Sequence, residues 1–243
     1  MGKHKLARFA ENLTFPNLFQ VSFEYLEEHG FEWRGRWNEF FGNDNPIVLE
    51  LGCGKGEYTI ALARENAARN YIGVDIKGAR LWRGAKTSNE EQMKNVAFIR
   101  TRIEMIASFF AKDEVSEIWI TFPDPQPKKP MKRLTSERFL SHYREMLRPG
   151  GPIHLKTDSR ELYDYTMDEV IAPAGYEVEF STADLYASGY GGMATAVQTF
   201  YESYTGRYSR VKAPAVIWFY RQFRSPVKIP HLHIHTGFTY QNL

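Results

Sequence analysis

Cysteine is almost absent from this sequence: Cys53 is the only one among 243 residues, so no intrachain disulfide bond can form. Such scarcity is typical of proteins that fold in a reducing compartment. Long hydrophobic runs are also missing, and no stretch is long enough to cross a bilayer. The first residues lack the apolar core of a secretion signal. We therefore expect a soluble protein of the cytoplasm that does not bind membranes.

An excess of charge of one sign is missing as well. Lysine and arginine number 31 against 29 aspartate and glutamate residues, a net charge of +2, so only local clusters can indicate a nucleic-acid ligand. The 43% of hydrophobic residues is typical of a globular protein and argues against disorder as the main state. Internal repeats and low-complexity tracts are absent. We predict one domain over residues 1–243, with an N-terminal extension (1–45), a core (47–224) and a tail (225–243).

From Ile47 onward, short apolar runs alternate with helical patterns. The runs expected to be strands are Ile47–Leu51, Tyr71–Ile76, Val96–Thr101, Glu117–Phe122, Ile153–Thr157, Tyr176–Phe180 and Val216–Phe223. Helices are expected from Glu57 to Arg69 and before Pro149, and a short helix with loops before Ile47. The alternation predicts an α/β, Rossmann-like fold: a mostly parallel seven-stranded sheet with helices on both faces. The last two runs lack a helix between them and predict a C-terminal antiparallel hairpin.

A glycine-rich turn, Gly52-Cys53-Gly54-Lys55-Gly56, follows the first of these strands directly. Glycines permit a tight turn and let a ligand approach the backbone, and the free N–H groups of a following helix favour an anion. In an open α/β sheet, ligands bind at the carboxyl ends of the strands. The turn therefore predicts a ligand site.

Two common nucleotide motifs are missing from this turn. A dinucleotide fingerprint requires a third glycine where this chain has Glu57 or Thr59. A Walker loop requires Gly-Lys-Ser or Gly-Lys-Thr, but here Gly56 follows Lys55. A nicotinamide-dependent oxidoreductase and a P-loop nucleotidase are thereby excluded.

The segment from Glu50 to Gly56 resembles motif I of the class I methyltransferases. That resemblance implies S-adenosylmethionine as cofactor, with Glu50, Gly52, Gly54 and Gly56 as binding residues. Asp75 ends the next predicted strand, where the family places the acid that holds the ribose hydroxyls, and a carboxylate accepts both hydroxyl protons. A turn that only tightens strand–helix packing is the alternative. We expect Cys53 to be a small buried residue and not a nucleophile.

The fourth strand ends in a proline-rich loop, Pro123-Asp124-Pro125-Gln126-Pro127-Lys128-Lys129-Pro130, which is followed by Lys132 and Arg133. The prolines stiffen the loop and exclude a helix. Asp124 is expected beside the cofactor. The cations that follow it in the sequence suit a polyanion such as a nucleic acid, whose nucleobase would be the substrate. A surface polyproline segment or a solvated basic loop are the alternatives.

Three segments resemble the bacterial tRNA (guanine-N7-)-methyltransferases. They are Phe122–Lys129 with Lys132-Arg133-Leu134, His154-Leu155-Lys156-Thr157-Asp158, and Thr199-Phe200-Tyr201-Glu202. The resemblance implies methylation of N7 of guanine-46 in the tRNA variable loop. It implies Asp124 as the catalytic acid, which also contacts the cofactor region, and Lys128, Asp158, Thr199 and Glu202 as substrate-binding residues. Lys132 and Arg133, with Lys128, are expected to hold phosphates.

Two positions depart from that family. Gln126 replaces a usual tryptophan. Arg102 stands where an aspartate usually binds the adenine amino group of the cofactor, and an arginine cannot accept that hydrogen bond. If Arg102 lies at the cofactor, a backbone carbonyl or Glu104 replaces the acid, or the affinity is altered.

Several residues also have an ordinary structural interpretation. Asp158 and Glu161 have the spacing of a capping box that opens a helix. Thr199 and Glu202 could be polar loop residues. The alternating His231, His233 and His235 suggest a metal site, but no acidic partner is evident and the proposed chemistry requires no metal. We expect no metal cofactor.

Other functions stay open at this stage. Asp124-Pro125-Gln126-Pro127 faintly resembles the motif of enzymes that methylate exocyclic amines, but lacks its final aromatic residue. A non-catalytic RNA-binding module on the same fold is the second alternative. The sequence is compatible with a monomer or a homodimer.

Overall fold

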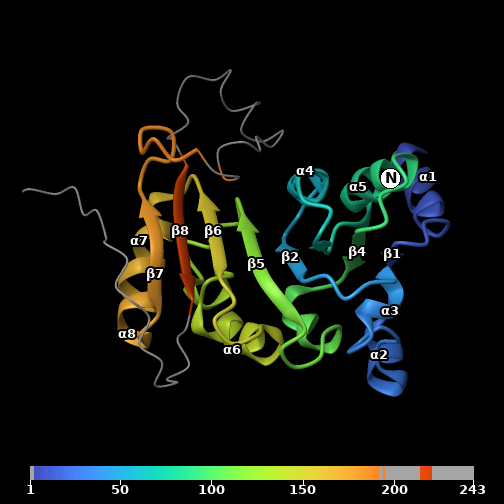
Figure 1. The fold of residues 1–243 in the computed structure, drawn as a ribbon, viewed down its shortest axis with the longest axis horizontal. Coiled ribbons are helices and arrows are strands. Elements are labelled where there is room, and N and C mark those ends of the chain that lie inside the picture. The colour runs from blue at the N-terminus through green and yellow to red at the C-terminus, as the bar shows by residue number, and fades with distance from the viewer. Residues whose placement is uncertain (1–2, 192–193, 195–213, 221–243) are drawn as a thin grey trace, which may run out of the picture.

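The computed structural model describes residues 3–191, 194 and 214–220 (Figure 1). Thr199, Glu202 and the three tail histidines, His231, His233 and His235, lie outside the described residues. Within the described ranges, no helix combines the length and the hydropathy that a bilayer crossing requires.

In the part of the chain that the structure describes, eight strands form one sheet in the order β1-β4-β3-β2-β5-β6-β8-β7 (Figure 1). The strands are β1 (Leu18–Phe19), β2 (Ile47–Leu51), β3 (Asn70–Asp75), β4 (Val96–Arg100), β5 (Val115–Thr121), β6 (Ile153–Thr157), β7 (Glu177–Thr182) and β8 (Ala215–Tyr220). All neighbours from β1 to β6 are parallel, whereas β8 pairs antiparallel with both β6 and β7. The carboxyl ends of the parallel strands therefore share one edge of the sheet.

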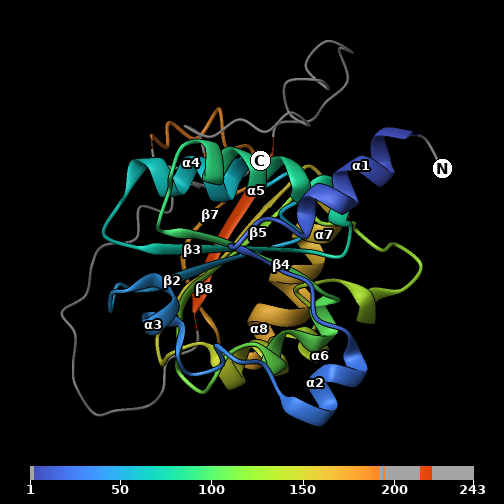
Figure 2. The ribbon, with the colours of Figure 1, turned by 90° about the vertical axis from the view of Figure 1, so that its right-hand side faces the viewer.

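Helices cover both faces of this sheet, as Figure 2 shows. On one face lie α1 (Lys3–Asn12), α4 (Glu57–Glu65) and α5 (Gly78–Glu90). The other face carries α2 (Phe23–His29), α3 (Trp37–Phe41), α6 (Glu137–Met146), α7 (Arg160–Tyr165) and α8 (Ala172–Ala174). The shorter turns are the 3₁₀ helices η1 (Ile103–Ser108) and η2 (Pro130–Lys132) and the π-helical turn η3 (Thr166–Ile171).

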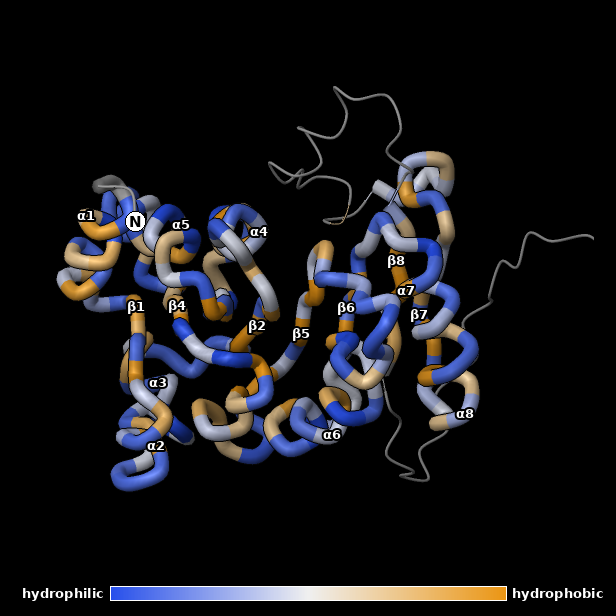
Figure 3. Tube along the Cα trace, turned by 180° about the vertical axis from the view of Figure 1, so that it is seen from behind, coloured by the Kyte–Doolittle hydropathy of each residue, from blue (hydrophilic) through white to orange (hydrophobic). Residues whose placement is uncertain are grey.

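The hydrophobic core lies between the sheet and these two helical layers. Every residue of β2, β3 and β6 is buried, as expected for parallel strands that are covered on both faces. Figure 3 shows the matching band of hydrophobic residues along the strands. The amphipathic α6 adds Phe139, Leu140, Tyr143 and Met146 to the core.

The predicted α/β architecture with a C-terminal antiparallel pair is confirmed, but the described residues form a sheet of eight strands and not seven. The additional strand, β1, lies in the segment for which a short helix and loops were predicted. Asn17 holds it in place: its carbonyl accepts the Phe98 N–H at 2.7 Å, and its side chain donates to Ser88 and to the Val96 carbonyl. A strand of two residues is too short to show an alternating pattern in the sequence.

One predicted helix end and one suggested helix cap differ from the structure. Helix α4 ends at Glu65 and not at Arg69, because Asn66 adopts an extended conformation and its side chain accepts the Ala68 N–H at 3.0 Å. Helix α7 is capped by Ser159 and not by Asp158: the Ser159 hydroxyl accepts the Leu162 N–H at 3.2 Å. The predicted capping box is therefore absent, and the carboxylate of Glu161 bonds elsewhere.

Candidate functional site

The glycine turn after β2 adopts a backbone shape that requires glycine. Gly52, Gly54 and Gly56 have φ values of 77°, 60° and 72°, a region that other residues rarely adopt. The Gly52 and Cys53 N–H groups donate to the Val74 carbonyl at 2.8 and 3.0 Å, which ties the turn to the end of β3. The turn is thus held across the ends of β2 and β3.

These glycines have different surroundings. A Cβ atom on Gly52 or Gly54 would meet nothing within 4 Å, because both face open space. A Cβ atom on Gly56 would lie 2.6 Å from the Phe98 ring and 3.3 Å from Gly84. Gly56 therefore allows α4 to pack closely on α5 and β4, whereas Gly52 and Gly54 leave room for a ligand.

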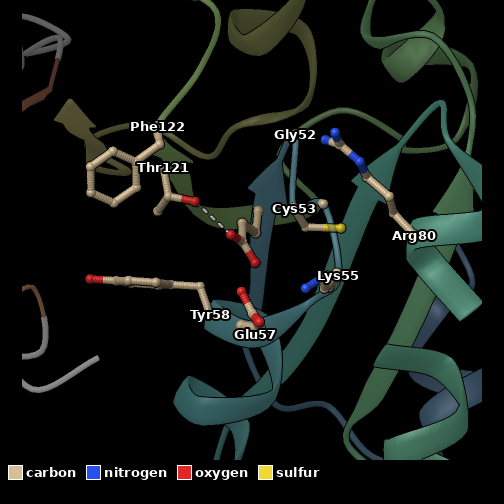
Figure 4. Close-up of a pocket in the computed structure, with 10 residues that line it drawn as sticks. Gly52, Cys53, Lys55, Glu57, Tyr58, Arg80, Thr121 and Phe122 are labelled. Carbon is tan, nitrogen blue, oxygen red and sulfur yellow. Dashed lines mark hydrogen bonds between the residues drawn. The ribbon is translucent and has the colours of Figure 1, made fainter. Parts of the chain in front are cut away.

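A cavity of about 330 Å³ opens beside this turn (Figure 4). Its volume is within the range of small-molecule sites. The rings of Tyr58 and Phe122 lie on one side of it and Arg80 on the other. The lining residues are Glu50, Gly52, Cys53, Gly54, Lys55, Glu57, Tyr58, Arg80, Thr121 and Phe122.

Glu50 lines this cavity from the end of β2 although its side chain is almost fully buried. One carboxylate oxygen accepts the Thr59 N–H at 2.8 Å and the Thr59 hydroxyl, and the other accepts the Thr121 hydroxyl at 2.7 Å. Burial raises the pKa of Glu50 to about 7, although these hydrogen bonds oppose the rise. Glu50 thus joins β2, α4 and the end of β5.

Asp75 lies at the end of β3 and is 9% exposed. Its carboxylate accepts the Gly54 N–H at 3.0 Å and the Lys77 N–H at 2.7 Å. Each carboxylate oxygen can accept a further hydrogen bond. Asp75 therefore fixes the glycine turn and retains acceptor capacity for a ligand.

Asp124 is exposed two residues beyond the cavity-lining Phe122. Their Cα atoms are therefore separated by at most about 7.6 Å. The Asp124 carboxylate accepts the Gln126 N–H at 3.0 Å, and the Phe122 N–H donates to the Lys156 carbonyl at 2.8 Å. Both Phe122 and Gln126 have positive φ values, 47° and 45°, so tertiary contacts must hold this loop in its shape.

The cations of the proline-rich loop do not all face solvent. Lys128 and Lys132 are exposed and available to a polyanion. Arg133 is 3% exposed, and its guanidinium bonds to Glu161 and to the Pro125 carbonyl. The prediction that Arg133 holds a phosphate is therefore wrong, because its side chain is already occupied inside the protein.

Of the remaining predicted residues, Cys53 lines the cavity, whereas Asp158 and Arg102 do not. Asp158 follows the last residue of β6 at the same sheet edge and is half-buried. Arg102 is exposed after β4, at the start of η1, and is not among the residues that line the cavity. Cys53 is buried, as predicted, and burial raises the pKa of its thiol well above the ordinary value.

The cavity suits a zwitterionic nucleoside of the S-adenosylmethionine type. Lys55 and Arg80 provide positive charge for a carboxylate, and Glu57 provides negative charge for an ammonium group. Asp75 lies at the adjoining strand end with acceptors for hydroxyl groups. In the part of the chain that the structure describes, no group of three or more histidine, cysteine, aspartate or glutamate side chains could hold a metal ion.

Six lining residues were not predicted as site residues from the sequence: Lys55, Glu57, Tyr58, Arg80, Thr121 and Phe122. Thr121 had a usable signal, because it ends β5, the strand that pairs with β2 and its Glu50. Tyr58 had none, since a tyrosine in the first turn of a helix usually belongs to the core.

Comparison with known proteins identifies the family. A family model described as "Putative methyltransferase" matches residues 44–193. A tRNA (guanine-N(7)-)-methyltransferase of Christiangramia forsetii is 54% identical over 206 residues, covering 83% of this chain and 92% of that protein. The protein of the same name from Bacteroides thetaiotaomicron is 51% identical, covering 83% of this chain and 80% of its own length. The chain belongs to the tRNA (guanine-N7-)-methyltransferase family.

Solved structures with the same fold are more distant in sequence. The 16S rRNA methyltransferase KamB matches with a TM-score of 0.60 at 14% identity, covering 77% of this chain and 93% of KamB. A mutant 16S rRNA (adenine(1408)-N(1))-methyltransferase from Catenulisporales acidiphilia, solved with its cosubstrate SAM, matches with a TM-score of 0.55 at 15% identity, covering 79% and 93%. These matches show that the fold is the Rossmann-like fold of class I methyltransferases.

Within the tRNA (guanine-N7-)-methyltransferase family, Gln126 is the departure that the structure explains in part. Its backbone N–H donates to the Asp124 carboxylate, and its positive φ turns the chain toward Lys129, whose N–H donates to the Gln126 carbonyl at 3.0 Å. These contacts use the backbone only. Gln126 can therefore shape the loop without the aromatic ring.

Proposed function

We propose that this protein transfers a methyl group from S-adenosylmethionine to N7 of guanine-46 in the variable loop of tRNA. One observation supports the proposal beyond family membership: the residues that line one side of the cavity directly precede the loop that carries Asp124. Thr121 and Phe122 line the cavity, and Asp124 is two residues further along the chain. A methyl donor in the cavity would therefore lie next to the loop that is expected to meet the acceptor base.

The residues of the cavity would orient the donor. When bound, S-adenosylmethionine supplies an electrophilic methyl group on sulfur. Gly52 and Gly54 leave space against the backbone, Lys55 and Arg80 offer positive charge to a carboxylate, and Asp75 offers acceptors to the ribose hydroxyls. Glu50 holds the cavity walls together through Thr59 and Thr121, so we assign it to the shape of the site as well as to binding.

The acceptor atom determines what the protein must do chemically. N7 of guanine carries an in-plane lone pair, and no proton has to leave before it attacks a methyl group. A strong general base is therefore unnecessary, and catalysis depends on alignment of the reacting atoms. Positive charge develops on the purine during the transfer, and the carboxylate of Asp124 can stabilise that charge electrostatically.

Binding of the tRNA would use the exposed residues around the same sheet edge. Lys128 and Lys132 are exposed on the proline-rich loop and are proposed to contact phosphates. Asp158, at the end of β6, is proposed to face the substrate, as are Thr199 and Glu202 by their resemblance to the family motif. A carboxylate among these can accept from guanine N1–H and the 2-amino group, which would select guanine over adenine.

Incubation with labelled S-adenosylmethionine and unmodified tRNA, followed by mass-spectrometric mapping, tests this proposal. We expect one N7-methylguanine at position 46 and no label in a tRNA with adenine at that position. A methylated exocyclic amine would instead support the first alternative. If the protein neither bound S-adenosylmethionine in a calorimetric titration nor labelled tRNA, the non-catalytic RNA-binding module would be favoured. We propose the cytoplasm as the place of this reaction.

A further inference from the structure

Arg133 is the one cation of the proline-rich loop that the structure buries: its side chain is 4% exposed, whereas Lys128, Lys129 and Lys132 are exposed. Its Nε donates to the Pro125 carbonyl at 2.9 Å. Its Nη2 group forms a hydrogen-bonded ion pair with the carboxylate of Glu161 in α7. The guanidinium also lies over the Tyr165 ring, 4.3 Å from its centroid.

These contacts hold a part of the loop that has few backbone N–H groups to form other hydrogen bonds. Prolines at 123, 125, 127 and 130 carry no N–H, so their backbone can be held only through carbonyl groups. The strained backbone of Phe122 and Gln126 on either side requires such support. Pro125 directly follows Asp124, and its carbonyl is the group that Arg133 holds.

We propose that Arg133 is a positioning residue that sets the location of Asp124 by holding the Pro125 carbonyl against α7. This inference rests on the proposed function, in which Asp124 acts on the acceptor base. Arg133 does not itself contact a phosphate. The buried guanidinium is paired with the half-exposed carboxylate of Glu161 and is packed against the Tyr165 ring.

The same contacts link two parts of the proposed substrate site. Glu161 and Tyr165 belong to α7, which begins two residues after Asp158. Arg133 therefore connects the loop that carries Asp124 with the helix that follows Asp158. A displacement of the guanidinium would therefore move Asp124 and Asp158 relative to each other.

The geometry requires arginine in particular. A guanidinium is planar and donates in several fixed directions, so it can bond to Pro125 and Glu161 while it stacks on Tyr165. A lysine ammonium would keep the charge but could not reproduce this planar arrangement. The conservative substitution Arg133→Lys consequently separates geometry from charge.

The first experiment measures single-turnover methyl transfer at saturating tRNA and S-adenosylmethionine. We expect Arg133→Lys to lower the rate by at least about tenfold, because small displacements of a catalytic group are costly. The salt dependence of tRNA binding should stay unchanged, whereas Lys132→Met should reduce its log–log slope by about one. The matched control is Arg138→Lys, the same substitution at an exposed arginine of α6, which should leave the rate unchanged.

The second experiment does not depend on activity. Hydrogen exchange of the Gln126 and Lys129 amides, both hydrogen-bonded within the loop, should become at least about tenfold faster in Arg133→Lys. If Arg133→Lys does not fold, Glu161→Gln gives the same readout, since it removes the ionic partner at a half-exposed position. An unchanged single-turnover rate, unchanged exchange, or a salt slope reduced by about one would overturn the proposal. Failure of the wild-type protein to form N7-methylguanine would overturn the proposed function alone, because the exchange measurement would still test the role of Arg133.

Discussion

The carboxylate of Glu50 shows how much a single residue depends on its surroundings. From the sequence, Glu50 is the acid of a cofactor motif. In the structure it accepts hydrogen bonds from Thr59 and Thr121 and is almost fully buried, so much of its role is internal. The same carboxylate therefore connects the stability of the protein to its donor site.

Glu50 should make the stability of the ligand-free protein fall as the pH rises. Burial raises its folded-state pKa from 4.5 to about 7, so the folded protein binds this proton more tightly than the unfolded chain. Its contribution is complete below about pH 4.5 and is lost as the pH rises through about 7. Between pH 5 and 8, the wild type should lose roughly 1–3 kcal/mol more free energy of unfolding than Glu50→Gln. Urea denaturation at both pH values measures this, and parallel pH profiles for the two proteins would contradict it.

The glycine turn offers a matched pair of substitutions. Gly56→Ala should destabilise the protein by about 3 kcal/mol, since it combines a positive φ with a close approach to the Phe98 ring. Gly54→Ala should cost only about 1 kcal/mol, because its Cβ would meet nothing within 4 Å. The Gly54→Ala substitution should instead weaken the binding of S-adenosylmethionine. Thermal denaturation and calorimetric titration separate these effects, and equal losses of stability would argue against the packing role of Gly56.

Asp124 is expected to act in the chemical step. Asp124→Asn keeps the size of the side chain but removes its charge, so single-turnover methyl transfer should fall by about 100-fold with saturating tRNA. The Gln126 N–H can still donate to an asparagine carbonyl, so the loop should keep its shape. Full turnover in this variant would remove Asp124 from the mechanism.

At the scale of elements, the loop from Pro123 to Arg133 combines two roles that the sequence does not separate. Its cations form one basic cluster in the sequence, but the structure places Lys128 and Lys132 in solvent and Arg133 inside the protein. The physical reason is the nearby Glu161 of α7, which neutralises only Arg133. A carboxylate 28 positions along the chain provides no local signal in the sequence.

Lys128 should therefore behave as a phosphate contact. Lys128→Met should lower the log–log salt slope of tRNA binding by about one and weaken binding at low salt, because one fewer counterion is released. S-adenosylmethionine affinity should not change, since Lys128 does not line the cavity. Filter binding at several salt concentrations measures the slope; an unaltered slope would exclude a phosphate contact.

At the scale of the whole molecule, the donor site joins several strand ends. Glu50 is the last residue but one of β2, Asp75 ends β3 and Thr121 ends β5, and all three are hydrogen-bonded across neighbouring segments. A ligand in the cavity would bind only the folded arrangement of these strands. Binding should consequently stabilise the protein as a unit.

S-adenosylmethionine at 100 times its dissociation constant should stabilise the protein by about 2.7 kcal/mol, which corresponds to a rise in melting temperature of roughly 5–11 °C. Asp75→Ala should reduce this rise strongly, because it removes acceptors for the ribose and a support of Gly54. The control is Asp164→Ala, at a half-exposed acid of α7 that pairs with Arg160. Thermal denaturation with and without ligand checks the prediction, and an equal rise in Asp75→Ala would contradict it.

The sequence by itself determined which site feature follows which strand: a glycine turn after one buried strand, an acid at the end of the next, and a proline-rich loop after the fourth. These features are local, because turns, strand patterns and glycine positions depend on neighbouring residues. The same motifs carry the resemblance to the family, and the family model and the 54% identical relative confirm it.

Only the tertiary structure decided which of these residues face a ligand and which face the protein. It added β1, shortened α4, transferred the cap of α7 to Ser159 and placed Arg133 in the interior. Each of these outcomes depends on hydrogen bonds or packing, and the burial of Arg133 depends on a partner distant in sequence. Burial and charge pairing are properties of three-dimensional contacts, and a linear pattern does not contain them.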